Sequence, residues 1–427
     1  MTPLLLAAVA AAILLFGLFS ARAERSPLTP PLFFVVVGYA LGPTLMDVVE
    51  PGAARPWIHG LAELTLVLVL FTDASRIHLD GLRREESLPA RLLGLGMPLT
   101  IGAGALAAMG LLPELGVWGW LLVAAILAPT DAALGQAVVS NPQVPVRIRQ
   151  SLNVESGLND GIALPVILAA ATLGGAIEAG EDLAGWIRFV ALQLVLGPAV
   201  GILVGLAGGR VLVRATAAGW VNGPFRRLAG LGLAGLAFAG AELVGGNGFI
   251  AAFTAGLTLG NTAREVCTCL YEFGEAEGQL LTLLVFLLFG GLLVPEALAH
   301  ADARLWGYAL LSLTVVRMLP VAVALLGSGL RPVSVAFLGW FGPRGLASIL
   351  FALLIVEESE LASTALLETV VVLTVLASTV AHGVTAYPLA SRYGRFVAAI
   401  RGRAEAEHAP APELPVRVAH GRRSVPG

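Results

Sequence analysis

Thirteen apolar stretches, separated by charged residues or by proline and glycine, run along this chain of 427 residues. A helix of about 20 apolar residues is long enough to cross the hydrocarbon core of a bilayer. Only 13% of the residues are charged, about half the fraction found in soluble domains, which excludes a water-soluble globule of this size. The sequence therefore predicts an all-α polytopic membrane protein with about 13 transmembrane helices, at residues 3–20, 31–46, 57–75, 91–112, 116–139, 150–176, 185–213, 227–244, 247–261, 278–294, 305–328, 333–356 and 363–388.

The arginines predict the orientation of the chain, since all 26 basic residues are arginine. Taking the loops alternately, 21 arginines fall on one side of the membrane and 3 on the other. Arginine-rich loops stay in the cytoplasm, so we expect a multi-pass cell (inner) membrane protein with its N-terminus outside and its C-terminus cytoplasmic. Arg22 and Arg25 follow the first stretch and no basic residue precedes it, which favours an outside-first anchor over a cleaved signal peptide.

The fifth stretch contains Pro129, Thr130 and Asp131. Proline removes a backbone donor and disfavours helix in the preceding residue, so we expect a break here. Backbone groups freed at bilayer depth need a polar cavity or a partner, and a charge there indicates function by default. The combination favours an ion site over a plain kink.

The densest polar cluster in any apolar stretch lies in the sixth, with Glu155, Ser156, Asn159 and Asp160. Residues three and four apart share one face of a helix. That face presents two carboxylates, a hydroxyl and an amide, and hard oxygen ligands suit a small alkali cation. We therefore expect a cation site on the sixth span.

A second break is predicted in the twelfth stretch, where Gly342, Pro343 and Gly345 surround Arg344. It lies seven spans after the first break, which gives the two spans opposite orientations. This is the arrangement of inverted repeats with two crossed discontinuous helices at the midplane. Asp131 and Arg344 would then neutralise the ends of the half-helices.

Arg317, in the eleventh stretch, needs a buried anion because an unpaired guanidinium is prohibitive in apolar surroundings. Glu155 and Asp160 are the candidates at a suitable depth. If Arg317 holds Glu155, Asp160 is left to titrate. The sequence leaves open whether Glu155 pairs with Arg317 or with Arg344.

Three motifs together resemble the monovalent cation:proton antiporters, in particular the NhaP-like sodium/proton antiporters of bacteria and archaea. They are Pro129-Thr130-Asp131, Glu155-Ser156 with Asn159-Asp160, and Gly342-Pro343-Arg344-Gly345. The resemblance extends from the first span to about residue 395 and implies a homodimer in the lipid bilayer. It also implies that the crossed fifth and twelfth helices hold the ion.

For the site residues, the resemblance implies that Asp160 is the principal cation ligand and the proton carrier. Asp131, Ser156 and the backbone of Thr130 would assist it. Arg317 would stabilise Glu155 and Asn159, and an asparagine before Asp160 is typical of electroneutral 1:1 exchange. Many relatives carry an acidic residue directly after the phenylalanine of the third span, whereas Asp73 here lies one position later. Asp73 is a ligand only if its carboxylate still reaches the site.

The resemblance further divides the chain into an interface domain, a core transport domain and a tail. The expected segments are 1–90 for the first interface part, 91–176 for the first core half, 177–300 for the linker helix and interface spans, 301–390 for the second core half, and 391–427 for a mostly disordered cytoplasmic tail.

The favoured function is secondary exchange of Na⁺ or Li⁺ for H⁺, with K⁺/H⁺ exchange as the alternative. No cofactor, catalytic residue or nucleic-acid partner is expected. An intramembrane aspartyl protease would need two facing membrane aspartates, which Asp131 and Asp160 offer, but it does not need buried arginines. A cation channel would need a repeated selectivity loop, which the sequence does not show. Cys267 and Cys269 are expected to be ordinary reduced thiols.

Overall fold

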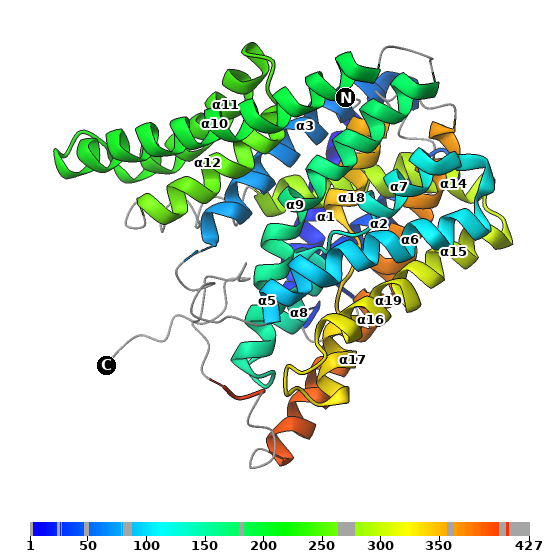
Figure 1. Ribbon diagram of the computed structural model, residues 1–427. Helices are drawn as coiled ribbons and strands as arrows, with labels where there is room; N and C mark the ends of the chain where they lie inside the picture. The colour runs from blue at the N-terminus through cyan, green and yellow to red at the C-terminus, as the bar shows by residue number, and fades with distance from the viewer. Residues whose placement is uncertain are drawn as a thin grey trace.

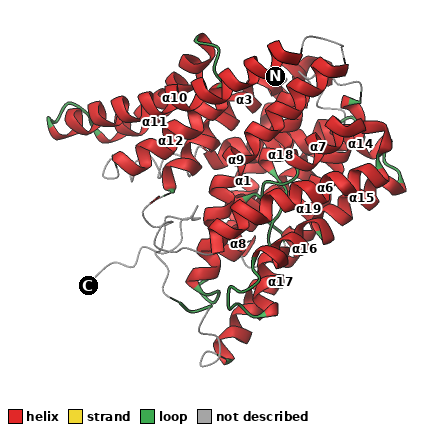
Figure 2. Cartoon of the chain, viewed as in Figure 1, coloured by secondary structure: helices red, strands yellow, loops and turns green. Residues whose placement is uncertain are grey.

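The structure is a computed structural model that describes residues 3–23, 26, 28–46, 51–77, 79, 88–178, 183–263, 278–356, 363–400 and 407–409. Within these residues the regular structure is entirely helical (Figure 2). The labelled helices are α1 (Pro3–Ala23), α2 (Pro30–Leu41), α3 (Pro51–Arg76), α5 (Leu88–Arg91), α6 (Met97–Leu111), α7 (Gly116–Ile126), α8 (Ala132–Val139), α9 (Val146–Glu178), α10 (Leu183–Ala217), α11 (Gly223–Leu243), α12 (Gly248–Thr262), α14 (Val294–Ala299), α15 (Ala303–Leu313), α16 (Val315–Ala324), α17 (Pro332–Trp340), α18 (Leu346–Phe351) and α19 (Thr364–Ala399).

Short segments of tighter or wider helix connect several of these elements. The π-helical turns η1 (Leu92–Gly96), η3 (Phe289–Leu293) and η4 (Ala352–Val356) continue α5, the helix at 278–288 and α18. A single 3-10 turn, η2 (Pro113–Leu115), precedes α7.

Each of the thirteen expected apolar stretches falls on helix in the part of the chain that the structure describes. Seven of the described helical segments are long and apolar enough to cross a bilayer by themselves, and α2 and Pro113–Ile126 are shorter apolar helices. The polytopic all-helical fold is therefore confirmed. Both expected breaks are present, since α7 ends before Pro129 and α17 ends before Pro343.

The last helix extends past the end of the thirteenth apolar stretch. Residues 391–399, the first part of the segment expected to be a mostly disordered tail, form the last turns of α19. The reason is packing, because the Tyr393 ring stacks on Phe337 with centroids 4.0 Å apart and its hydroxyl donates to Ser334 at 2.9 Å. Farther along, the buried Glu407 accepts hydrogen bonds from the Arg331 amide at 2.9 Å and the Ser334 hydroxyl at 2.8 Å, at the start of α17.

Glycines bring α2 into backbone contact with η3. A Cβ at Gly38 or Gly42 would collide with the backbone of Leu287 or Gly291, and one at Gly290 would collide with that of Val35. We call this contact the α2–η3 seam. Small residues of this kind allow membrane helices to approach closely.

A second glycine-lined group joins α3, α10 and α12, which lie with α11 at one side of the molecule (Figure 1). A Cβ at Gly256 or Gly260 of α12 would meet the backbone of α3 at Phe71 or Ser75. On its other side, α12 is approached by Gly201 of α10, where a Cβ would meet the backbone of Ala251. These contacts make α3, α10 and α12 one tightly packed layer.

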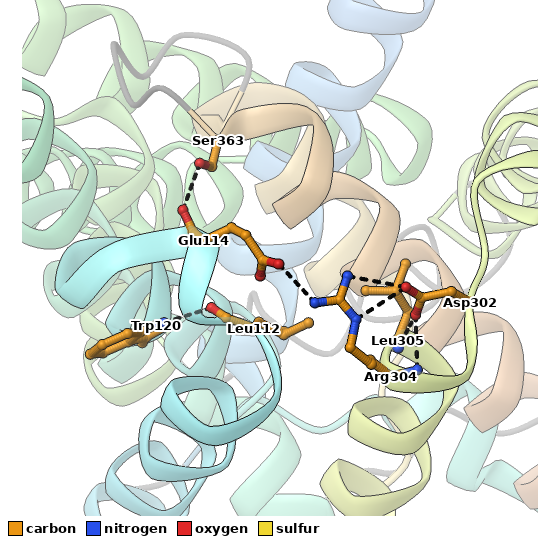
Figure 3. A network of polar contacts seen from close by, with 7 residues as sticks. All are labelled: Leu112, Glu114, Trp120, Asp302, Arg304, Leu305 and Ser363. Carbon is orange, nitrogen blue, oxygen red and sulfur yellow. Dashed lines mark hydrogen bonds and ion pairs between the residues drawn. The ribbon is translucent and has the colours of Figure 1, made fainter.

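An exposed polar network links the segments at the starts of α7, α15 and α19 (Figure 3). Arg304 contacts Glu114 at 2.7 Å and Asp302 at 3.2 Å, and the Ser363 hydroxyl donates to the Glu114 carbonyl oxygen at 3.0 Å. The hydrogen bond from Arg304 lowers the pKa of the Glu114 carboxyl. The pKa of Asp302 is lowered as well, first by the Leu305 amide that it caps. Three connections between spans therefore meet around one guanidinium.

Candidate functional site

The two broken spans meet at their breaks. The Asp131 amide donates to the Pro343 carbonyl oxygen at 2.8 Å, and the Ser348 hydroxyl of α18 donates to the Ile126 carbonyl oxygen of α7 at 2.7 Å. Backbone groups that each break removes from its own helix thus find partners on the other span. This satisfies the requirement that polar backbone at bilayer depth be paired.

Asp131 caps two helices at once. One carboxylate oxygen accepts from the Ala133 amide at 2.7 Å, at the start of α8, and the other accepts from the Leu346 amide at 2.6 Å, at the start of α18. Helix N-termini carry partial positive charge and attract anions. A Cβ at Gly345 would collide with this carboxylate, which explains why glycine precedes Leu346.

Arg344 makes the complementary contact with the end of α7. Its guanidinium donates to the carbonyl oxygens of Ala128 and Pro129, the latter at 3.3 Å. Arg344 is fully buried, and a cation is favourable at the negative end of a helix. The half-helix ends at the crossing are therefore balanced by one anion and one cation.

The polar face of α9 lies against the first break through Thr130. The Ser156 hydroxyl donates to the Thr130 carbonyl oxygen at 2.6 Å, and the Asn159 amide donates to the Thr130 hydroxyl at 2.7 Å. All three residues are buried. Asp160 follows Asn159 on the same helix and is also buried, at 7% exposure. The structure thus brings the non-helical segment at Thr130 against the helix that carries Asp160.

Glu155 pairs with Arg317 of α16 through contacts of 2.6 and 2.9 Å, with both side chains at most 3% exposed. Two charges can be buried together when such geometry compensates their desolvation. A Cβ at Gly342 would collide with the Arg317 guanidinium. The second break therefore also packs on this ion pair.

Asp73 is half-buried on α3. It lies next to α9, since a Cβ added at Gly157 of α9 would lie 3.7 Å from the Asp73 carbonyl oxygen. Its backbone is therefore level with the polar face of α9, near Ser156 and Asp160. Cys267 and Cys269 lie outside the described residues.

A cavity of about 460 Å³ adjoins the last turns of α9, beyond Asp160 in the chain. It lies among α3, α9, α10, α11 and α12, and its polar lining includes His59, Glu63, Gln193 and Glu242.

Sequence reasoning missed three residues that contact the crossing: Ser348, Ser378 and His382. Ser378 accepts from the Arg344 amide at 2.7 Å, and His382 contacts the Trp340 carbonyl oxygen at 2.9 Å. A histidine inside an apolar span is itself an indication of function, and applying that rule to histidine would have found His382.

A family model described as "Sodium/hydrogen exchanger, transmembrane" matches residues 10–392. The chain belongs to this sodium/hydrogen exchanger family. Exchangers are transporters, so family membership overturns the protease alternative and agrees with the expectation that the chain is not an enzyme.

Curated relatives of this exchanger-family chain carry names for different cations. The K(+)/H(+) antiporter NhaP of Alkalimonas amylolytica is 26% identical over 69% of this chain and 50% of its own length. Na(+)/H(+) antiporter 2 of Zygosaccharomyces rouxii is 28% identical over 59% of this chain and 33% of its own length. The chain spans about half the length, or less, of these curated relatives.

Solved structures give the fold of this family member. The sodium proton antiporter MjNhaP1 from Methanocaldococcus jannaschii at pH 8 superposes with a TM-score of 0.75 and 20% identity, over 91% of this chain and 99% of that one. An electron-microscopy structure of the same antiporter gives a TM-score of 0.69 and 18% identity, over 97% and 100%. The fold is therefore that of the NhaP antiporters.

Proposed function

We propose that this chain exchanges a monovalent cation for H⁺ by alternating access, with cation and proton competing for Asp160. The observation that carries the proposal is the contact of Ser156 and Asn159 with Thr130. It places an oxygen-rich, non-helical segment beside the buried carboxylate of Asp160. Oxygen ligands without thiolate or imidazole suit an alkali cation. Asp160 is the principal ligand and the proton carrier in this scheme.

The neighbouring residues divide the remaining tasks. Ser156, the Thr130 backbone and Asp131 assist the cation, and Asp73 is a further ligand if its carboxylate turns toward α9. Arg317 holds Glu155, and Asp160 exchanges the proton. One carboxylate that carries either one cation or one proton makes the exchange electroneutral and 1:1.

The moving part is the core formed by residues 91–176 and 301–390, which slides against an interface domain formed by 1–90 and 177–300. The glycine-lined layer of α3, α10 and α12 supports this division, since close backbone contacts make a rigid wall. A homodimer joined through the interface domain would hold that wall fixed. With the N-terminus outside and the C-terminus cytoplasmic in the cell membrane, the cavity bordered by Glu63 and Glu242 is the external access route.

The experiment is cation-driven proton flux in proteoliposomes, followed by the dequenching of a pH-sensitive dye. Wild type should respond to both gradients and saturate with the cation, and Asp160→Asn should abolish the response. The matched control is Glu296→Gln, which neutralises an exposed carboxylate on α14 and should leave exchange intact. Full exchange by Asp160→Asn would remove Asp160 from the mechanism, and flux that never saturates would favour a channel.

Na⁺ or Li⁺ is the first choice of cation. K⁺ is the second candidate, favoured by the name of the Alkalimonas relative at 26% identity. Comparing Na⁺, Li⁺ and K⁺ in the same vesicles across a range of pH decides between them. Imposing a membrane potential during turnover tests electroneutrality, because a potential should leave the exchange rate unchanged.

A further inference from the structure

One face of α19 contacts the second break on both of its sides. Ser378, His382 and Thr385 lie one turn apart on this face. Ser378 and His382 are at most 1% exposed. Ser378 contacts Arg344, the residue after Pro343, and His382 contacts Trp340, the last residue of α17. The Trp340 indole donates to the Thr385 hydroxyl at 3.0 Å, so both the backbone and the side chain of Trp340 contact α19.

These contacts provide hydrogen-bond partners for backbone groups that the break removes from the helix. Between Trp340 and Leu346 the backbone leaves the helical path, so the Trp340 carbonyl oxygen and the Arg344 amide no longer pair with each other. The carbonyl oxygen accepts instead from the Gly342 amide at 2.9 Å. A buried polar group without a partner costs about 1–3 kcal/mol, and no water is available in the hydrocarbon core to replace it. Ser378 gives the Arg344 amide its partner, and His382 gives the Trp340 carbonyl oxygen a second donor besides the Gly342 amide.

The direction of each hydrogen bond follows from its donors and acceptors. A carbonyl oxygen only accepts, so Nε2 of His382 carries the proton given to Trp340. In the neutral ring, Nδ1 then accepts from the Ser378 hydroxyl at 3.1 Å, and that hydroxyl accepts from the Arg344 amide at 2.7 Å. The bonds therefore form one chain, from the Arg344 amide through Ser378 and His382 to Trp340.

A doubly protonated ring would break this order. Nδ1 also lies 3.0 Å from the Ser378 carbonyl oxygen, and it can donate there only if both ring nitrogens carry protons. The ring would then be a third cation beside the buried Arg344 and Arg317, with Glu155 already engaged by Arg317. Burial of an uncompensated charge is strongly unfavourable, so the neutral ring is the form that holds the break.

We propose that Ser378 and His382 are positioning residues for cation binding, and that together they clamp the second break in the shape that the ion site requires. The proposal rests on the proposed antiport. Hydrogen bonds connect these residues to the ion site. The Arg344 amide donates to Ser378, and the Arg344 guanidinium donates to the carbonyl oxygens of Ala128 and Pro129, next to Thr130.

The experiment measures the apparent KM for the cation and the maximal exchange rate in proteoliposomes for Ser378→Ala and His382→Ala. Each variant removes the two hydrogen bonds that its side chain makes in this chain, so the apparent KM should rise about tenfold, more than the maximal rate falls. Because the two residues act as one unit, the double variant should resemble the more affected single variant.

Matched controls separate positioning from general packing. Thr379→Val removes the hydroxyl of an equally buried neighbour that hydrogen-bonds within its own helix, to the Val375 carbonyl oxygen 2.8 Å away, and it should keep the wild-type KM. Ser378→Thr keeps the hydroxyl and His382→Gln keeps an N–H donor, and both should recover much of the affinity. If Ser378→Ala is not recovered as folded protein, Ser378→Cys keeps the volume with a weak acceptor and should show a raised KM.

Two outcomes overturn the inference. Ser378 variants with the KM of Thr379→Val, or with a lowered unfolding temperature and an unchanged KM, would make the clamp structural only. A wild-type protein that exchanges no cation would overturn the proposed function and this inference with it. A wild type that exchanges normally beside unaffected Ser378 variants would overturn the inference alone.

Discussion

Glu155 and Arg317 form a doubly connected ion pair, 2.6 and 2.9 Å long, although 162 residues separate them in the chain. Both side chains are withdrawn from solvent, and the pair supports the second break through Gly342. We expect it to contribute to the folded state mainly by keeping either charge from being buried alone.

Removing one partner of this pair should therefore cost more than removing both. Arg317→Ala leaves a buried carboxylate and should lose about 3–5 kcal/mol of stability, seen as a lower unfolding temperature in detergent and a poor yield. Replacing both residues, Glu155→Gln with Arg317→Met, should restore part of that loss. Equal losses in the single and double variants would argue against the pairing.

Asp131→Asn should weaken the crossing, because an amide has one acceptor oxygen where the carboxylate uses two. Either the Ala133 or the Leu346 amide would then face an NH₂ group, at a cost of about 1–3 kcal/mol. Thermal unfolding measures the loss of stability, and exchange assays should show weaker cation binding. A variant as stable as wild type would show that the two caps do not act together.

Gly345→Ala should abolish exchange, since its Cβ would occupy the position of the Asp131 carboxylate. The matched control is Gly135→Ala, in α8 of the other broken span, where an added Cβ meets nothing within 4 Å. That control should exchange normally and gain slightly in stability, because alanine favours helix by about 1 kcal/mol over glycine. Normal exchange by Gly345→Ala would contradict the close contact at the crossing.

The exposed network around Arg304 should stabilise the protein in a pH-dependent way. Folding lowers the pKa of both Glu114 and Asp302, so their contribution is complete above their ordinary values of 4.5 and 3.8 and disappears as the pH falls through the lowered values. Arg304→Ala should therefore lower the unfolding temperature slightly at neutral pH, and the difference from wild type should shrink as the pH falls below these ordinary values.

The matched control for that prediction is Arg188→Ala, which removes another exposed arginine and should have no such pH dependence. Added salt should reduce the difference between wild type and Arg304→Ala, because exposed charges are screened. A difference that persisted at low pH and high salt would point to lost packing by the Arg304 side chain.

The helices and both breaks could be predicted from the sequence because their causes are local. Apolar length determines a span, and Pro129 and Pro343 lack the amide that a helix needs. The polar face of α9 follows equally from the spacing of Ser156 and Asn159.

The partners could not be predicted, because they depend on how distant spans cross. Nothing near Asp131 in the chain indicates that it caps α18, 215 residues away. The extension of α19 to Ala399 depends on Tyr393 finding Phe337, a contact that only the packed fold creates. His382 differs from these partners, because a titratable side chain inside an apolar stretch is a local signal.

The α2–η3 seam provides a fixed reference distance for studying transport. At Gly38 and Gly290 main chain lies directly on main chain, so there are no side-chain rotamers through which the two segments could slip past each other. A pair of spectroscopic probes placed across the seam should report one constant separation in every transport state. Any change measured from either segment to another part of the molecule can then be assigned to that other part.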